Sequence, residues 1–189
     1  MDSNPVAAGK SCFDLIDKDK TFSVLAVKPN SSFLDLACGT GKYSIEASKI
    51  IGKKGTIYAV DLWEEGIQAL NSEIEARNIT NIETIVADIT KKIPLEDNSI
   101  DACLMATIIH DLSRRARDAS LREVARVLKP EGILNIIEFK KIDEGPGPPV
   151  DIRLREGEIE SIVSVHGFKK VYAGEAGPYN YILKFKKSK

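Results

Sequence analysis

The sequence has neither a charge imbalance nor a long apolar run. Its 189 residues include 27 basic and 28 acidic side chains, so no excess charge favours binding to nucleic acid or to an anionic membrane surface. No run of apolar residues approaches the length of about 20 that a membrane-spanning helix needs. We therefore expect neither nucleic acid nor a membrane as a partner.

Cysteine is scarce as well. The three cysteines are an odd number without a close Cys-X-X-Cys pair: Cys12, Cys38 and Cys103. Disulfide-stabilised secreted domains and structural zinc sites usually carry even numbers or close pairs of cysteines. The composition thus predicts reduced thiols in a cytoplasmic protein and no metal site. Cys38 is interpreted as a small apolar filler.

Repeats and any sign of a second domain are also absent. Five apolar runs have the character of buried strands: residues 33–37, 56–61, 82–87, 100–109 and 133–139. Apolar residues at helical spacing predict the helices between several of them: residues 42–51, 63–77 and 114–128. This alternation predicts an α/β fold with a doubly wound, mostly parallel sheet in one domain, residues 1–189.

The two ends of the chain flank a predicted core of residues 31–140. Residues 1–30 are expected to form one or two short helices. Residues 141–189 begin with a Gly- and Pro-rich loop that cannot be a helix or an inner strand, followed by a helix over 153–165. The last two apolar runs predict an antiparallel hairpin: residues 168–173 and 179–185. With this hairpin the predicted sheet has seven strands.

A glycine turn follows the first predicted strand. Gly39 and Gly41 lack a Cβ, so the backbone can turn sharply there and approach a ligand closely. The next helix begins near Lys42 and presents unpaired backbone N–H groups. A strand, a glycine turn and a helix start are together typical of nucleotide and nucleoside sites. The turn alone also fits a plain connection, because Ser44 stands where a dinucleotide site carries its third glycine.

Acidic residues strengthen the ligand interpretation. Asp35 lies within the first predicted strand, and Asp61 and Asp88 end the second and third. The carboxyl ends of parallel strands meet at one edge of the sheet, where such sheets bind ligands. Asp61 follows the glycine turn by about 20 residues, the place of a ribose-binding acid. Each acid has an alternative role as a helix cap or in a surface turn.

Four segments make the chain similar to class I S-adenosylmethionine-dependent methyltransferases: Leu34–Gly41, Val60–Leu62, Ala87–Ile89 and Arg126–Gly132. Their order and spacing resemble the branch that includes the ubiquinone/menaquinone-type C-methyltransferases and many small-molecule methyltransferases. The resemblance implies a Rossmann-like fold, S-adenosylmethionine as cofactor, S-adenosylhomocysteine as product, and in-line displacement of a methyl group onto a small-molecule acceptor. It also implies that residues 1–30 form a lid over the cofactor, with Phe13 as a candidate. Ordinary packing of Phe13 on the sheet is the alternative.

The resemblance assigns roles at the ligand edge. Asp35 would hold the cofactor's ammonium group, directly or through water. Asp61 would accept both ribose hydroxyls, and Asp88 would accept the adenine amino group. The other cofactor-binding residues are assigned by their positions in the motifs: Ala37, Gly39, Gly41 and Ala106 beside the methionine part, and Leu62 and Ile89 around the adenine.

The acceptor side rests on two residues at strand ends. His110 follows the fourth predicted strand and is a candidate general base; the alternative is that it caps the next helix or packs beside Asp111. Glu138 ends the fifth strand, as in the quinone-type branch, and is expected either to bind the acceptor or to steady a cap. The Asn-Pro-Pro-aromatic tetrad of adenine and glutamine methyltransferases is absent after the fourth strand, which argues against those acceptors.

Two other function classes remain open at this point. A nicotinamide-dependent oxidoreductase can use the same kind of sheet, but Ser44 and Asp88 speak against it. A non-catalytic module could keep the fold and the cofactor as a subunit of a complex, because binding residues alone do not guarantee turnover.

Overall fold

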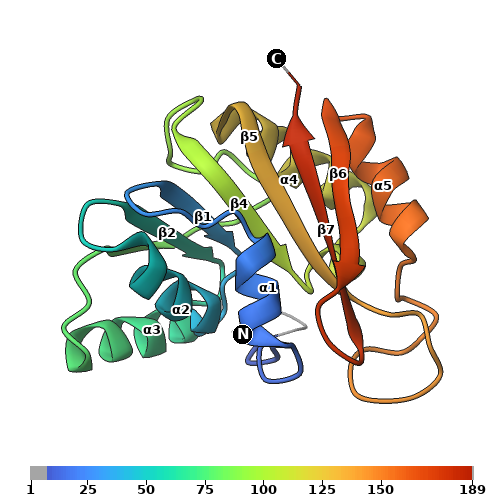
Figure 1. The fold of residues 1–189 in the computed structure, drawn as a ribbon, viewed down its shortest axis with the longest axis horizontal. Helices are drawn as coiled ribbons and strands as arrows, with labels where there is room; N and C mark the ends of the chain where they lie inside the picture. Colours follow the sequence, from blue (N-terminus) through green and yellow to red (C-terminus); the bar gives the residue numbers. More distant parts are fainter. Residues whose placement is uncertain (1–7, 189) are drawn as a thin grey trace, which may run out of the picture.

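The computed structural model describes residues 8–188, which form a seven-stranded sheet with helices on both faces (Figure 1). The strands are β1 (Ser32–Leu36), β2 (Thr56–Asp61), β3 (Ile82–Val86), β4 (Ile100–Ala106), β5 (Leu128–Phe139), β6 (Phe168–Glu175) and β7 (Asn180–Lys187). The helices are α1 (Lys18–Val24), α2 (Lys42–Ile51), α3 (Glu64–Ala76), α4 (Arg114–Val127) and α5 (Glu156–Ser164). The strand order is β3-β2-β1-β4-β5-β7-β6, with β7 antiparallel to both of its neighbours. The predicted Rossmann-like fold with a C-terminal hairpin is confirmed.

Strand β1 is an inner strand of the sheet. It pairs in parallel with β2 on one side and with β4 on the other. The strand order reverses between these neighbours, so the loops after β1 and β4 leave a crevice at the carboxyl ends of the strands. In Figure 1 these ends of β1 and β4 point toward the lower edge. The crevice is therefore where a ligand site is expected.

Alternate residues of β1 pack on opposite faces of the sheet. Phe33 belongs to a buried cluster with apolar side chains of α1 and α2. Leu34 and Leu36 belong to a second cluster with side chains of α4 and α5. In Figure 1, α1 lies in front of the sheet and α4 behind it. Burial on both faces explains why the central strands are apolar along nearly their whole length.

The described segment before β1 contains one helix, α1. Asp17 caps this helix by accepting a hydrogen bond from the backbone N–H of Lys20 at 3.1 Å. Phe13 packs edge-on against the ring of Tyr43 in α2, with 5.0 Å between the ring centroids. Phe13 therefore packs on α2. The structure has two cavities at the carboxyl ends of the central strands, and Phe13 lines neither of them. Residues 1–7 of the expected lid lie outside the described residues.

Strand β4 ends at Ala106, earlier than the predicted end at Ile109. Thr107 has a left-handed φ of 52°, which turns the chain out of the strand. A short 3-10 turn, Ile109–Asp111, follows. The apolar residues at 108 and 109 resemble a continued strand in the sequence because they pack against the core beyond the strand end.

Strand β5 begins at Leu128, earlier than the predicted start at Ile133. Leu128 caps α4 and already has extended backbone angles, so the helix passes into the strand without a loop. The register with β4 shifts between Ile100 and Ala102, which marks a bulge. The Pro and Gly of residues 129–132, which predict only a helix stop, are accommodated in this irregular part of the strand.

The longest described helix is α4, with 14 residues. No helix within residues 8–188 is long and apolar enough to cross a membrane. The same residues contain no group of three or more His, Cys, Asp or Glu side chains that could hold a metal ion.

The glycine turn between β1 and α2 supports the fold at Gly41. This residue has a φ of 69°, and a Cβ added there would lie 2.5 Å from both terminal methyl carbons of the buried Leu70 in α3. Gly39 in the same turn has a φ of 56°, but an added Cβ would meet no atom within 4 Å. The left-handed backbone should cost either alanine variant about 1–2 kcal/mol, and the clash should cost Gly41→Ala about 1–3 kcal/mol more.

We therefore expect Gly41→Ala to lower the free energy of unfolding by more than Gly39→Ala does. Urea unfolding of the two variants and the parent protein measures this difference. Equal losses would contradict the contact between the turn and α3.

Candidate active site

Two adjoining cavities lie at the carboxyl ends of the central strands. The larger has a volume of about 220 Å³ and the smaller about 30 Å³. Seven of the predicted cofactor-binding residues line the larger cavity: Ala37, Gly39, Asp61, Leu62, Asp88, Ile89 and Ala106. Asp35 lines only the smaller cavity, and Gly41 lines neither because it packs under α3. The three predicted acids thus lie around one pair of adjoining cavities.

A wider hollow of about 820 Å³ is an open groove between α4 and α5. Its lining includes Arg114, Arg115 and Arg117 but none of the predicted cofactor-binding residues. Because the glycine turn and the strand-end acids converge elsewhere, the candidate site is the pair of cavities at the strand ends and not this wider groove.

Asp61 joins the glycine turn to the end of β2. Its Oδ2 accepts a hydrogen bond from the backbone N–H of Gly39 at 2.7 Å, and its Oδ1 accepts one from the N–H of Trp63 at 2.8 Å. Each carboxylate oxygen has a second acceptor site, so Asp61 can accept two further hydrogen bonds. That number matches the two hydroxyls of a ribose. The N–H of Gly39 is already committed to a carboxylate, which makes this turn a poor phosphate cradle.

Asp35 is buried beside the smaller cavity. The hydroxyl of Ser44 donates a hydrogen bond of 2.6 Å to its Oδ2. Burial raises the pKa of Asp35 to about 6, because it outweighs the hydrogen bond from Ser44, which lowers the pKa; the charge of Asp61 adds a smaller increase. Ser44 therefore has a structural reason to replace a third glycine. Burial, with the charges of Asp35 and Asp61, also raises the pKa of Cys38 well above its ordinary value, so this thiol stays protonated and is a poor nucleophile.

The far end of the larger cavity combines apolar side chains with one acid. Ile89 is buried, whereas Leu62 is 55% exposed, and both line the cavity. Asp88 Oδ1 accepts hydrogen bonds from the backbone N–H of Thr90 at 2.9 Å and from its hydroxyl at 2.7 Å. Burial alone would raise the pKa of Asp88, but these hydrogen bonds and Lys91 lower it overall. The acid is therefore a charged acceptor at the cavity wall.

Sequence reasoning missed two contributions to this wall. Trp63, the single tryptophan of the chain, lines the larger cavity and packs against Gly66. Residues 8–10 also line this cavity, and residues 9–11 line the smaller one. The position of Trp63 directly after the Asp61-Leu62 pair is a signal that could have identified it. No periodic pattern marks residues 8–11.

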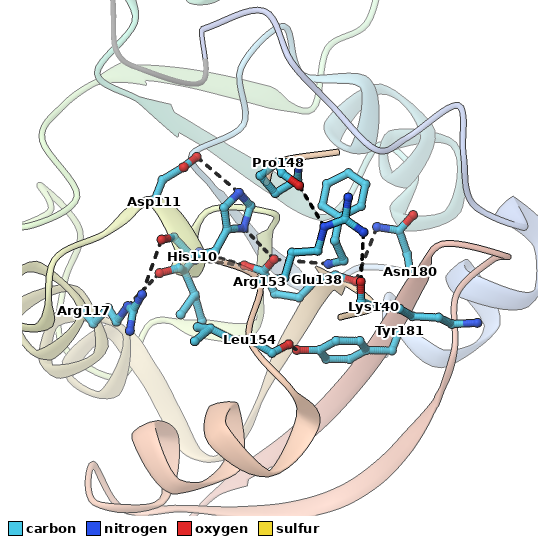
Figure 2. A network of polar contacts seen from close by, with 12 residues as sticks. His110, Asp111, Arg117, Glu138, Lys140, Pro148, Arg153, Leu154, Asn180 and Tyr181 are labelled. Atoms are coloured by element: carbon cyan, nitrogen blue, oxygen red, sulfur yellow. Dashed lines mark hydrogen bonds and ion pairs between the residues drawn. The ribbon is translucent and has the colours of Figure 1, made fainter. Parts of the chain in front are cut away.

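His110 and Glu138, proposed separately from the sequence, are in contact (Figure 2). His110 Nδ1 lies 2.7 Å from Glu138 Oε2, and because a carboxylate only accepts, Nδ1 carries the proton. Glu138 Oε1 accepts from the backbone N–H groups of Ile109 and His110 at 3.0 and 3.3 Å. Glu138 is 1% exposed, so its carboxylate faces protein donors. It holds both the 3-10 turn and the imidazole ring.

The charges around His110 favour its protonated form. Burial alone would lower the pKa of His110, but the hydrogen bond and charge of Glu138, assisted by Asp111, raise it despite the opposing charge of Arg117. The His110 Nε2 atom lies 3.5 Å from Asp111 Oδ2. Arg117 holds the same turn from the other side by donating to the carbonyls of Ile109 and His110. The His110 side chain is only 4% exposed and lines neither cavity.

A loop that follows β5 covers the neighbourhood of this pair. The buried guanidinium of Arg153 donates to the carbonyls of four loop residues: Lys140, Ile142, Pro146 and Pro148. Arg153 lies over the ring of Phe139, and that ring is edge-on to His110 at 6.3 Å between centroids. Arg153 therefore organises the loop, which also explains why α5 begins at Glu156 and not at the predicted Arg153.

Comparisons with known proteins match this architecture. The sequence family described as "Methyltransferase domain" matches residues 33–132. The crystal structure of a SAM-dependent methyltransferase from Aquifex aeolicus is 31% identical, with a TM-score of 0.85 over 93% of this chain and 92% of that one. The ubiquinone/menaquinone biosynthesis C-methyltransferase UbiE of Shewanella sp. (strain W3-18-1) is 27% identical over 165 residues. That match covers 87% of this chain but only 62% of the Shewanella protein.

A further structural relative shows the range of this fold. The [4+2]-cyclase SpnF has a TM-score of 0.76 over 90% of this chain, at 18% sequence identity. Such a likeness establishes the shared fold and nothing about a shared reaction.

The environment of His110 leads to a prediction for its titration. The chain has only two histidines, and burial, the largest influence on His166, lowers the pKa of that residue. We expect His110 to titrate above 6.5 and His166 below it. The Glu138→Gln variant should lower the pKa of His110, since the stabilising negative charge is lost. NMR titration of the imidazole nitrogens measures both values, and His166→Gln assigns the signals.

The same shift affects stability. Because the pKa of His110 is higher in the folded than in the unfolded chain, its protonation stabilises the fold below about pH 6.5, and this contribution is lost as the pH rises through the folded-state pKa. Asp111→Asn, a milder change, should reduce the shift less than Glu138→Gln. If the pKa of His110 in both variants equals that in the parent protein, neither acid controls the protonation of the ring.

Proposed function

The chain belongs to the methyltransferase domain family of class I S-adenosylmethionine-dependent enzymes, and from this premise we propose that it methylates a small-molecule acceptor that loses a proton in the reaction. Its activity is that of an S-adenosylmethionine-dependent methyltransferase. This membership removes the grounds for the nicotinamide alternative. The Shewanella relatives carry a name from quinone biosynthesis, which supports a small acceptor.

The residues at the strand ends suit S-adenosylmethionine. This cofactor has a cationic amino-acid end, a ribose diol and an adenine, but no phosphate. The cavities offer three carboxylates, of Asp35, Asp61 and Asp88, which attract cations and hydroxyl groups and would repel a pyrophosphate. An added Cβ at Gly39 would meet no protein atom within 4 Å, so the turn leaves open space beside the cavities. The donor set therefore fits the cofactor.

We assign the cofactor's parts accordingly. Asp61 would accept the two ribose hydroxyls with the remaining acceptor sites of its two oxygens. Leu62 and Ile89 would contact the adenine faces, and Asp88 would accept its amino group. Asp35 would balance the ammonium group, and the backbone near Gly39 would lie along the methionine part. Residues 8–30 would close this side of the site as a lid segment, of which residues 8–11 border the cavities.

The covered His110–Glu138 pair is the observation that most favours a small acceptor. A side chain that is 4% exposed cannot contact the surface of a macromolecule. Glu138 would act as a positioning residue, since its carboxylate already accepts from the ring and from three backbone N–H groups. His110 would be the catalytic residue, because within the described residues its Nε2 makes only the longer contact of 3.5 Å with Asp111 Oδ2.

Methyl transfer requires few further groups from the protein. When bound, S-adenosylmethionine supplies a methyl group on a positively charged sulfur that leaves as a neutral thioether. The cavity walls would align the acceptor with this methyl and exclude water. In its neutral form, at a pH above its raised pKa, His110 would accept at Nε2 the proton that the acceptor loses when it is methylated. A hydroxyl group or an activated ring carbon fits this requirement.

Methyl-labelled S-adenosylmethionine tests the acceptor class. The protein is incubated with a metabolite extract freed of macromolecules and, separately, with the protein and nucleic-acid fractions of the same cells. We expect the label in the metabolite sample, with incorporation reduced about 100-fold or more by His110→Gln. His166→Gln, the same substitution at the other histidine, should leave incorporation unchanged.

Label on protein or nucleic acid alone would overturn the small-acceptor proposal. Full incorporation by a folded His110→Gln variant would overturn the role of His110 as a base. S-adenosylhomocysteine affinity, measured for each variant, separates these outcomes from a loss of cofactor binding.

The raised pKa of Asp35 gives a test of its proposed partner. An ammonium group beside the carboxylate would lower this pKa from about 6, so binding near that pH releases a proton. We expect S-adenosylhomocysteine to release up to about half a proton at pH 6 and none at pH 8, where Asp35 is already ionised. Calorimetric titration in two buffers of different ionisation enthalpy measures the release.

Asp35→Asn is the matched variant, since it keeps the shape and removes the titration. Identical proton release by Asp35→Asn and the parent protein would show that another group is responsible.

A further inference from the structure

The amino-acid end of S-adenosylmethionine carries a carboxylate as well as an ammonium group. Asp35 suits the ammonium, but none of the roles above accounts for the carboxylate. Two cationic side chains line the smaller cavity beside Asp35, namely Lys10 and Lys42. Either of them would offset the like charge of Asp35 for a carboxylate placed near that acid.

Lys42 already has a partner. Its ammonium group forms an ion pair and hydrogen bond with Asp14, in the segment before α1. The hydrogen bond from Lys42 is the main reason why the pKa of Asp14 is lowered. Lys42 therefore ties the N-terminal segment to the start of α2, and its charge is already paired with that of an acid.

Lys10 is placed differently. It lines both cavities, is exposed, and forms no ion pair with any residue in the described part of the chain. The backbone around it is held close to the site. A Cβ added at Gly9 would lie 3.6 Å from the Trp63 ring, and Cys12 Sγ lies 3.1 Å from the hydroxyl of Tyr43 in α2.

We propose that Lys10 binds the carboxylate of S-adenosylmethionine and of its product, and that it thereby selects cofactors with an intact amino-acid end. The inference rests on the proposed placement of the cofactor, with its ammonium group at Asp35. A flexible ammonium on a segment that borders both cavities can reach the carboxylate while the rest of the cofactor stays on the strand ends. Residues 8–11 thus contribute recognition as well as cover.

The test compares two ligands that differ only in the carboxylate, S-adenosylmethionine and its decarboxylated form. Trp63 is the single tryptophan and lines the larger cavity, so its fluorescence reports binding of either ligand. The parent protein should bind S-adenosylmethionine about tenfold more tightly than the decarboxylated form. Lys10→Gln should remove this preference by weakening only the carboxylate-bearing ligand, and Lys10→Arg should retain most of it.

Lys42→Gln is the matched control, because it removes the other cation of the same cavity. It should keep the preference for S-adenosylmethionine. A full preference in Lys10→Gln, or its loss only in Lys42→Gln, would overturn the assignment of Lys10. Failure of the folded parent protein to bind either ligand would instead overturn the cofactor placement itself. Asp61→Asn should weaken both ligands equally, which distinguishes the loss of a contact shared by the two ligands from the loss of the carboxylate contact.

Discussion

The candidate site depends on one carboxylate that connects two loops. Asp61 ends β2, yet its oxygens accept from Gly39 in the turn after β1 and from Trp63 at the start of α3. The turn has left-handed residues at Ala37, Gly39 and Gly41, a conformation that isolated peptides rarely keep. By accepting the Gly39 N–H, Asp61 holds this backbone where both cavities meet. The same side chain therefore shapes the site and keeps acceptor capacity for a ligand.

Two buried acids show how the structure handles charge on either side of the site. Asp35 has one strong partner, the hydroxyl of Ser44, and its pKa rises to about 6 because burial outweighs that bond. Glu138 has three backbone N–H groups and the His110 ring as partners. An acid with few partners gains most from an arriving cation, whereas an acid with several is already satisfied. This contrast explains why Asp35 suits ligand binding and Glu138 suits positioning.

The sequence predicts the fold and the convergence of the three acids at one edge of the sheet, because both depend on local patterns. Buried parallel strands are apolar on both faces, and an acid at a strand end marks the sheet edge wherever the neighbouring strands lie. The sequence does not predict that His110 and Glu138 touch, since they are 28 residues apart and meet only through the β4–β5 pairing. Nor does it predict that Gly41 serves packing, because Leu70 reaches it from another helix.

This division between the two halves explains how one fold can serve different reactions. The proposed cofactor edge lies on β1, β2 and β3, whose end residues are fixed by the sheet. The proposed acceptor side lies on the turn after β4 and the loop after β5, which are held by single side chains such as Glu138 and Arg153. Changes in these loops leave the sheet intact, so a cyclase and methyltransferases can share the architecture. In the proposed function, the choice of acceptor therefore depends on residues that no strand pattern determines.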